Sequence, residues 1–341
     1  MTVALLSRIQ FAVSITFHYI YPPLSIGLSL AIFIMGLIYL KTKDPVWQRI
    51  SKFWVKVFAL TFALGIASGI PLPFAFGTNF ARYSQFVGDV FGSVLSAEGF
   101  FAFLVEAGFL GILLFGWDRV SPLVHTFAAG MVTFGAHFSG FWIVIANAWM
   151  QAPTGYKLVQ GPGGKIVAHV DRLKDIIFTE SSLNHLSHTL FSAWLTGAFL
   201  MISIAAYYLY KERHVLFSIK TMKLGVLIAL TSCIFQFISA DSLARFVAKA
   251  QPEKLAAFEG VFETKSYTPA YVFGWVDGKT RKTHGLKVPG LLSLMVYRDA
   301  KSLYQDSMIL IEVIGLWCKL LRMDMCRMSQ VFLLKFPNIY V

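Results

Sequence analysis

Six long apolar stretches interrupt this 341-residue sequence, and they constrain the fold more than any other feature. A helix of about 20 apolar residues crosses the ~30 Å of hydrocarbon in a bilayer. Most of the stretches reach or exceed this length, and the sixth is at the short end. Because backbone groups in lipid must bond within their own helix, we predict an all-α, polytopic transmembrane helical bundle. The stretches are 11–40, 53–76, 91–117, 122–150, about 185–210 and about 224–240.

The composition agrees with this prediction. Hydrophobic residues make up 56% of the chain and charged residues 14%, and the mean hydropathy is +0.64. A soluble domain is nearer one quarter charged, so the excess apolar side chains are expected to face lipid. The first stretch is too long for a cleaved signal peptide and has no small-residue cleavage site, so we expect it to remain as a helix.

The net charge of +12 is concentrated beside alternate helix ends. The connection between the second and third helices has Arg82 alone. Because basic residues in short loops mark the cytoplasmic side, the N-terminus is predicted to face outward, with about 151–184 and the segment beyond Asp241 also outside. Lysines beside helix ends indicate a lipid bilayer and no nucleic-acid partner. The basic residues of the connections after helices one, three and five are Lys41, Lys43, Arg49 and Lys52; Arg119; and Lys211, Arg213, Lys220 and Lys223.

Polar residues inside the apolar stretches are costly in a bilayer, so each is a functional candidate. His18 lies among aromatic residues, as an axial haem ligand requires; the alternative is a hydrogen bond to a neighbouring helix. Glu98 and Glu106 are eight residues apart, which on an α-helix means ~12 Å of rise and ~80° beyond two turns. They are predicted to be a metal ligand and a proton-relay carboxyl. The alternative is two acids paired with arginines on other helices.

Four further histidines fall near or within the fourth and fifth stretches. His185 and His188 share a helix face, but His185 is closer to the water boundary, so His188 is preferred as the buried ligand. His125 and His137 are interpreted, from the residues alone, as packing or hydrogen-bonding residues. The predicted helix directions place His18, Glu98 and His188 at a similar depth near the outer face. Glu106 is deeper.

Several short motifs, in a constant order over roughly residues 1–300, resemble subunit I of the cytochrome bd-type quinol oxidases. The motifs are Leu6-Ser7-Arg8-Ile9-Gln10-Phe11-Ala12, His18 with the following prolines, Phe76-Gly77-Thr78-Asn79, Glu98-Gly99, Glu106, Gly116-Trp117-Asp118-Arg119, Asn147-Ala148-Trp149-Met150-Gln151, His188-Thr189, Asp241, and Lys254-Leu255-Ala256-Ala257-Phe258-Glu259.

The resemblance implies an enzyme of the bacterial cytoplasmic (inner) membrane that oxidises membrane quinol and reduces dioxygen to water. It implies a second membrane subunit, a low-spin haem b, a high-spin haem b and a haem d, and no copper. By position, His188 resembles the axial ligand of the low-spin haem iron. His18 resembles the ligand of a high-spin haem iron, with Glu98 at the same site.

The resemblance also assigns proton and quinol residues. Glu106 and Ser139 are similar to members of a path that brings protons from the inner side. Lys254 and Glu259 resemble quinol-site residues in an outer loop, with Asp241 as a further candidate. From the residues alone, Lys254 and Glu259 would be interpreted as a solvated charge pair.

The end of the chain departs from the family pattern after about Ala300. The family continues through further helices that supply a Met and a Glu haem ligand and a Gly-Arg-Gln-Pro-Trp motif, none of which is found here. We therefore expect a haem-binding bundle at 1–240, a partial quinol-binding loop at 241–300 and an aberrant tail at 301–341. A truncated or altered-frame product would explain this tail. The alternative functions are a haem-binding membrane protein without oxidase activity and, with less support, a transporter that uses the buried carboxylates.

Overall fold

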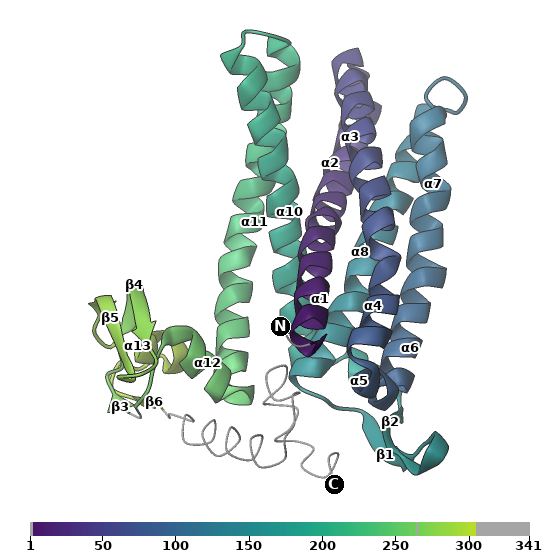
Figure 1. Cartoon of the computed structure of the whole chain (residues 1–341). Helices are drawn as coiled ribbons and strands as arrows, with labels where there is room; N and C mark the ends of the chain where they lie inside the picture. Colours follow the sequence, from purple (N-terminus) through teal and green to yellow (C-terminus); the bar gives the residue numbers. More distant parts are fainter. Residues whose placement is uncertain (1–2, 264, 305–341) are drawn as a thin grey trace. The chain divides into compact units, whose positions relative to one another are not determined.

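The computed structural model describes residues 3–263 and 265–304 of the chain (Figure 1). From residue 305 onward, the predicted tail lies outside the described residues. In chain order, the first elements are α1 (Val3–Tyr19), α2 (Tyr21–Thr42), α3 (Pro45–Gly69), α4 (Pro71–Asn79), α5 (Ala81–Phe86), α6 (Gly88–Ala97), the π-helix η1 (Glu98–Phe103), α7 (Leu104–Phe115) and α8 (Pro122–Gln151). The others are β1 (Tyr156–Gln160), the 3-10 turn η2 (Pro162–Gly164), β2 (Ile166–Val170), α9 (Leu173–Ile177), α10 (Glu180–Tyr210), α11 (Val215–Ala250), α12 (Pro252–Glu259), β3 (Lys265–Ser266), β4 (Ala270–Asp277), β5 (Lys282–Val288), α13 (Leu291–Tyr297) and β6 (Leu303–Tyr304).

The described residues contain six helical segments long and apolar enough to cross a membrane. The predicted all-α transmembrane bundle is therefore confirmed. Strands form only short two-stranded antiparallel pairs among the described residues: β1–β2, β3–β6 and β4–β5. The six membrane segments are Leu5–Thr42, Pro45–Asn79, Gly88–Phe115, Pro122–Gln151, Glu180–Tyr210 and Val215–Ala250.

The sixth segment is much longer than the predicted stretch 224–240, because its helix continues into polar sequence at both ends. Near its start, Lys220 pairs with Asp44, which also caps α3 by accepting a hydrogen bond from the Val46 N–H at 2.9 Å. Near its end, Asp241 and Arg245 form an i,i+4 ion pair at 2.9 Å. Hydropathy marks the part of a helix that lies in hydrocarbon, not the helix ends.

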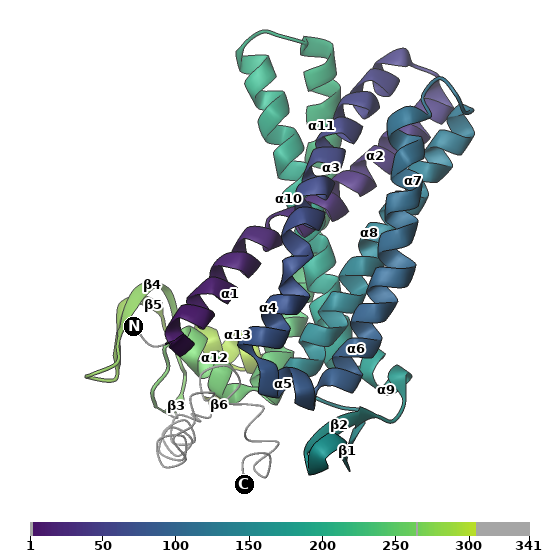
Figure 2. The same cartoon turned by 45° about the vertical axis from the view of Figure 1, so that its right-hand side comes forward.

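Two membrane segments are broken by prolines. The first changes direction between α1 and α2 (Figure 2), where Pro22 and Pro23 begin the second helix. The second is broken between α3 and α4, where Pro71 follows Ile70. Proline lacks an N–H and clashes with the preceding turn, so it ends one helix and is tolerated at the start of the next.

The chain divides into two compact units, Met1–Asn147 with Thr154–Phe237, and Ala148–Pro153 with the chain from Ile238 onward. In the first unit, α2 packs against α3 and α10. A Cβ at Gly27 would lie 2.4 Å from the Ala193 carbonyl oxygen, and one at Gly197 would lie 2.6 Å from the Gly27 carbonyl carbon. Only small residues allow two helix backbones this close. The largest fully buried side chains around α2 and α3 are Leu28, Ile32, Met35, Ile50, Trp54 and Phe58.

The turns of the first unit fall at two opposite ends (Figure 1). The α2–α3, α7–α8 and α10–α11 turns share one end, and the start of α1 lies at the other with α5 and the β1–β2 hairpin. The predicted basic clusters therefore gather at one end. That this end faces the cytoplasm stays a prediction.

The second unit has a small core of its own. Its buried side chains come from the end of α11, from α12 and the loop just after it, and from α13. The antiparallel β4–β5 hairpin lies between α12 and α13 in the sequence. The predicted boundaries 1–240, 241–300 and 301–341 stay a prediction. The buried core residues are Val247, Leu255, Ala256, Val261, Leu292 and Val296.

Candidate functional site

The two acids of the third membrane segment are separated by a π-helix. Glu98 is the first residue of η1, and Glu106 lies in the first turn of α7. A π-helix bonds i to i+5 and frequently marks a functional site. The wider turn rotates less per residue than an α-helix, so the predicted α-helical offset of ~80° is wrong for this segment. Both acids contact one stripe of α8: Glu98 at Ser139, and Glu106 one turn earlier at Gly135.

Ser139 binds the first of these acids directly. Its hydroxyl donates to Glu98 Oε1 at 2.7 Å, and both side chains are half-buried. The contact joins two helices and places a hydroxyl, which can both donate and accept, beside a carboxyl. The resemblance places Ser139 with Glu106 and does not predict its contact with Glu98. The roles of all three residues in catalysis stay a prediction.

Glu106 is the most enclosed acid of the site. It is 5% exposed, and its Oε1 has no hydrogen-bond partner among the described residues. A Cβ at Gly135 would lie 2.9 Å from Glu106 Cβ and 3.0 Å from its backbone nitrogen, so α8 and α7 touch here. No ion pair to Glu98 or Glu106 occurs in the described part of the chain. The alternative of acids paired with arginines is therefore not what the described helices show.

His18 contacts a hydroxyl on α3. Its Nδ1 lies 3.0 Å from the Ser68 hydroxyl oxygen, which also lies 2.7 Å from the Leu64 carbonyl oxygen. When the hydroxyl hydrogen bonds that carbonyl, Ser68 accepts from His18 Nδ1–H and the lone pair is on Nε2, the arrangement that metal-ligating histidines use. A Cβ at Gly69 would come within 2.8 Å of His18 Cε1, so glycine is what lets the ring lie here. The donor chemistry of His18 fits an axial haem ligand.

His188 faces an amide on the next helix. The Gln236 Nε2 atom of α11 lies 3.1 Å from both ring nitrogens of His188, which is half-buried on α10. An amide N–H can donate to the lone pair of a neutral imidazole. His188 would hold a haem iron through such a lone pair, in place of the amide contact.

The remaining histidines of the membrane segments bond to protein groups. Both nitrogens of His137 are used, in line with its interpretation as a hydrogen-bonding residue. Their contacts are His125 Nε2 to the Leu113 carbonyl oxygen (3.2 Å), His137 Nδ1 to the Thr133 carbonyl oxygen (2.7 Å), Trp194 Nε1 to His137 Nε2 (2.7 Å), and His185 Nδ1 to the Ser181 carbonyl oxygen (2.7 Å).

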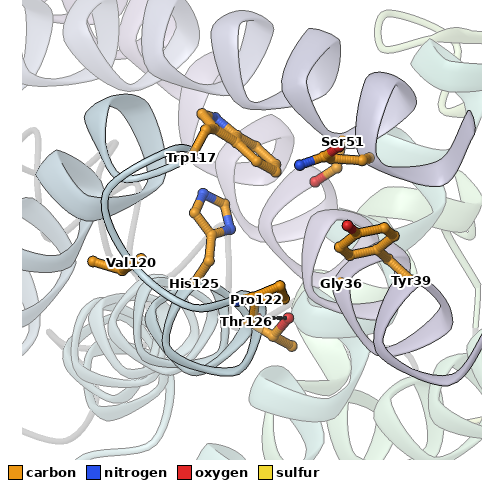
Figure 3. Close-up of a pocket in the computed structure, with 9 residues that line it drawn as sticks. Gly36, Tyr39, Ser51, Trp117, Val120, Pro122, His125 and Thr126 are labelled. Carbon is orange, nitrogen blue, oxygen red and sulfur yellow. Dashed lines mark hydrogen bonds between the residues drawn. The ribbon is translucent and has the colours of Figure 1, made fainter. Parts of the chain in front are cut away.

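His125 also lines a small pocket at the end of the first unit that holds the α7–α8 turn (Figure 3). Its ring lies against Trp117, with centroids 3.7 Å apart. Tyr39 and Ser51 point toward the same space from α2 and α3. The Lys52 ammonium lies 5.2 Å from the centre of the Trp117 ring. The Gly116–Arg119 motif therefore forms a turn whose Trp117 ring packs against His125 and lies near the Lys52 ammonium.

In the second unit, Lys254 and Glu259 do not form the charge pair that the residues alone suggested. The Lys254 Nζ donates to Gln151 Oε1 at 2.8 Å and lies 5.8 Å from the centre of the Phe258 ring. Burial lowers the pKa of the Lys254 ammonium and raises the pKa of the Glu259 carboxyl. Burial favours the neutral form of each group, so both pKa values move toward neutral pH. Each group can then gain or lose a proton more readily at that pH.

Asp241 forms ion pairs with two arginines. Its Oδ2 atom lies 2.9 Å from Arg245 Nη2 and 2.7 Å from Arg298 Nη2. The second contact ties the residue after α13 to α11. In the structure Asp241 therefore acts as an anchor between two elements, and its predicted quinol role stays a prediction.

Sequence reasoning did not single out Ser68, Gln236 or Gln151 as site residues. Each contacts a candidate residue from a distant part of the chain. Only the motif Asn147–Gln151, which ends at Gln151, offered a signal.

The site is that of an α-helical membrane protein with carboxyls and histidines inside its membrane segments. A family model described as "Cytochrome bd terminal oxidase subunit I" matches residues 6–306. The chain belongs to this family, and the predicted resemblance is confirmed.

Two proteins and one solved structure with names of this family are similar to the chain. The chain is 36% identical over 301 residues to the cytochrome bd-II ubiquinol oxidase subunit 1 of Escherichia coli (strain K12), covering 85% of this chain and 56% of that protein. It is 35% identical over 300 residues to the cytochrome bd ubiquinol oxidase subunit 1 of Bacillus subtilis (strain 168), covering 87% and 63%. It thus spans about three fifths of the length of these relatives. The structure of bd oxidase from Geobacillus thermodenitrificans matches with a TM-score of 0.82 and 26% identity, covering 98% of this chain and 79% of that one.

Proposed function

We propose that the chain acts as the catalytic subunit of a quinol:oxygen oxidoreductase in the bacterial cytoplasmic membrane. In this role it oxidises membrane quinol and reduces dioxygen to water, together with a second membrane subunit and with its N-terminus outside. The observation that carries the proposal is the pair of acids that contact one stripe of α8. Glu98 is bonded to Ser139, and Glu106 is buried with a carboxyl oxygen that lacks a partner. Membership of the family supports the same reaction.

The proposal includes a low-spin haem b, a high-spin haem b and a haem d, without copper. His188 would bind the low-spin haem iron and His18 a high-spin haem iron, with Glu98 at the latter site. Bound haem would supply electron transfer and the binding of dioxygen. The Ser68 contact supports this assignment, because a hydroxyl that accepts from His18 Nδ1–H leaves the lone pair on Nε2 for the iron.

The proton route follows from the low dielectric of the membrane. Reduction of dioxygen to water consumes protons, and a bare proton does not enter hydrocarbon, so titratable or hydroxyl groups must be spaced along the way. Glu106, Ser139 and Glu98 are such groups on two touching helices. We propose that protons from the inner side reach Glu106 first and then the Glu98–Ser139 pair.

Quinol oxidation requires a base and a cation outside the membrane core. A quinol releases two protons with its two electrons. Glu259 would accept one proton from a quinol hydroxyl, and Lys254 would donate a hydrogen bond to a quinol oxygen. The raised pKa of Glu259 supports this step, because a carboxyl of ordinary pKa is a weaker base.

The proposal is tested on the oxidase purified from membranes with its second subunit. Haem is measured by the pyridine haemochrome spectrum, and oxygen consumption is measured with a short-chain ubiquinol. Haem together with quinol-driven oxygen uptake is expected. Haem without oxygen uptake would favour the haem-binding protein without oxidase activity, and absence of haem would overturn both. In the same preparation, His188→Ala is expected to abolish the low-spin signal. An unchanged signal would remove His188 as the ligand.

A further inference from the structure

The end of α8 and the start of α12 are joined through one glutamine. Gln251 Nε2 donates to the Gln151 backbone carbonyl at 2.7 Å and to Gln151 Oε1 at 3.2 Å. Lys254 Nζ donates to the same Oε1 at 2.8 Å. Gln251 is 2% exposed, so this junction is shielded from water. All of these residues belong to the second unit.

The contacts have a clear physical origin. The last carbonyl groups of a helix have no partner within the helix, and the Gln251 amide supplies one for α8. Lys254 follows Gln251 by three residues, which places both side chains on one side of the chain entering α12. Docking of Gln251 therefore brings the Lys254 ammonium to the Gln151 side chain.

The acceptor that holds this ammonium is neutral. An ammonium has three N–H donors, and the described contacts use one of them on Gln151 Oε1. No ion pair to Lys254 occurs among the described residues. A carboxylate at this place would bind the ammonium more strongly and would cancel its charge. The amide fixes the position of the charge and leaves it uncompensated.

We propose that Gln151 is a positioning residue for quinol oxidation, whose amide oxygen holds the Lys254 ammonium so that its other donors bind the quinol oxygen. This inference rests on the proposed function. As the quinol hydroxyl loses its proton, negative charge develops on its oxygen. A fixed, uncompensated cation stabilises that charge without having to reorganise.

The first experiment compares Gln151→Ala with Gln151→Glu in the purified two-subunit oxidase, using a short-chain ubiquinol. Gln151→Ala keeps the backbone carbonyl that Gln251 binds. Removing a hydrogen bond to a charged group is expected to raise KM for quinol about tenfold, with a smaller change in kcat. Gln151→Glu is expected to keep the contact with Lys254 and raise its pKa. The alkaline limb of the kcat/KM profile should then move to higher pH, while the rate on the plateau falls.

A double-mutant cycle separates positioning from a structural role. In a Lys254→Ala background, Gln151→Ala should have no further effect on KM. Haem spectra and thermal midpoints check that each variant is folded. An unchanged KM in Gln151→Ala, or an equal effect in both backgrounds, would overturn the inference. So would an unmoved alkaline limb in Gln151→Glu. In each case a wild-type enzyme that consumes oxygen with quinol would leave the proposed function standing, whereas an inactive wild type would remove that function itself.

Discussion

Glu106 and Glu259 are two carboxyls with proposed proton roles, and the molecule shields them from water in different ways. Glu106 lies inside a membrane helix, where it is 5% exposed and in contact with the backbone of α8 at Gly135. Glu259 is the last residue of the eight-residue α12 and is half-buried. The next residue, Gly260, ends that helix in the left-handed conformation with φ 61°.

The difference shows which part of the fold sets the position and surroundings of each carboxyl. Glu106 lies between membrane helices that approach closely because Gly135 has no side chain, so close packing sets its position. The surroundings of Glu259 come from a short helix held by a few side-chain hydrogen bonds and a small core. Changes near Glu106 should act through packing and proton supply, and changes near Glu259 through the local charge of the quinol site.

The largest effect is expected from Glu106→Gln. Glutamine keeps the shape of the side chain and removes the exchangeable proton. General acid–base groups contribute about 10²–10⁴ in rate, so quinol-driven oxygen consumption should fall by at least about tenfold. Glu106→Asp should be milder. Haem content is measured in parallel, since loss of a haem would also slow turnover. Wild-type oxygen reduction in a fully haem-loaded Glu106→Gln enzyme would return Glu106 to a structural role.

The next effect concerns the glycine beside Glu106. Gly135→Ala places a methyl group 2.9 Å from Glu106 Cβ and 3.1 Å from the Ala102 carbonyl oxygen. Overpacking of this kind costs about 1–3 kcal/mol, so the thermal midpoint should fall and oxygen reduction should slow. Gly108→Ala on α7 is the matched control, because nothing lies within 4 Å of its Cβ position. If both variants behave alike, close contact at Gly135 is not what positions Glu106.

A moderate effect is expected on the pH dependence at Glu259. Only the ionised carboxyl accepts a proton, so kcat/KM for quinol should rise as the pH increases through the raised pKa of Glu259. It should fall again where Lys254 loses its proton, at a pH below the usual lysine range because burial lowers that pKa. The resulting bell-shaped pH profile of kcat/KM should be narrower than the profile of a lysine and a glutamate with ordinary pKa values. Glu259→Gln should remove the acid limb and lower the rate severalfold, as measured by oxygen uptake across pH. An acid limb that persists in this variant would assign it to another group.

The smallest effect is expected from Asp241→Asn. Its ion pairs with Arg245 and Arg298 are partly exposed, and such pairs contribute about 0–1 kcal/mol each. We expect a small drop in thermal midpoint and nearly unchanged quinol kinetics. A large rise in KM without loss of stability would instead place Asp241 in contact with quinol.

The sequence was most informative where a polar residue interrupts an apolar stretch. His18, Glu98 and Glu106 stand out because polar groups in hydrocarbon are costly, and the long apolar stretches located the six membrane segments. Lys254 and Glu259 are ordinary charges in a polar segment, so only the resemblance indicated a role for them. Ser68 and Gln151 could not be found locally, because their importance lies in partners 50 and 103 residues away in the chain. The π-helix left no recognised pattern in the residue types.

The π-helix makes the length of this segment a functional quantity. If one residue between Glu98 and Glu106 were deleted, the helix could close into regular α-helical turns with hydropathy almost unchanged. The wider turns hold about one residue more than α-helical turns, so the rotation between the two acids would stay near the ~700° of seven α-helical residues, and Glu98 would remain on the side of Ser139. A second deletion would find no wide turn to absorb it, and would turn Glu98 by about 100° away from Ser139. The π-helix therefore gives this segment a tolerance of one residue in length, and no more.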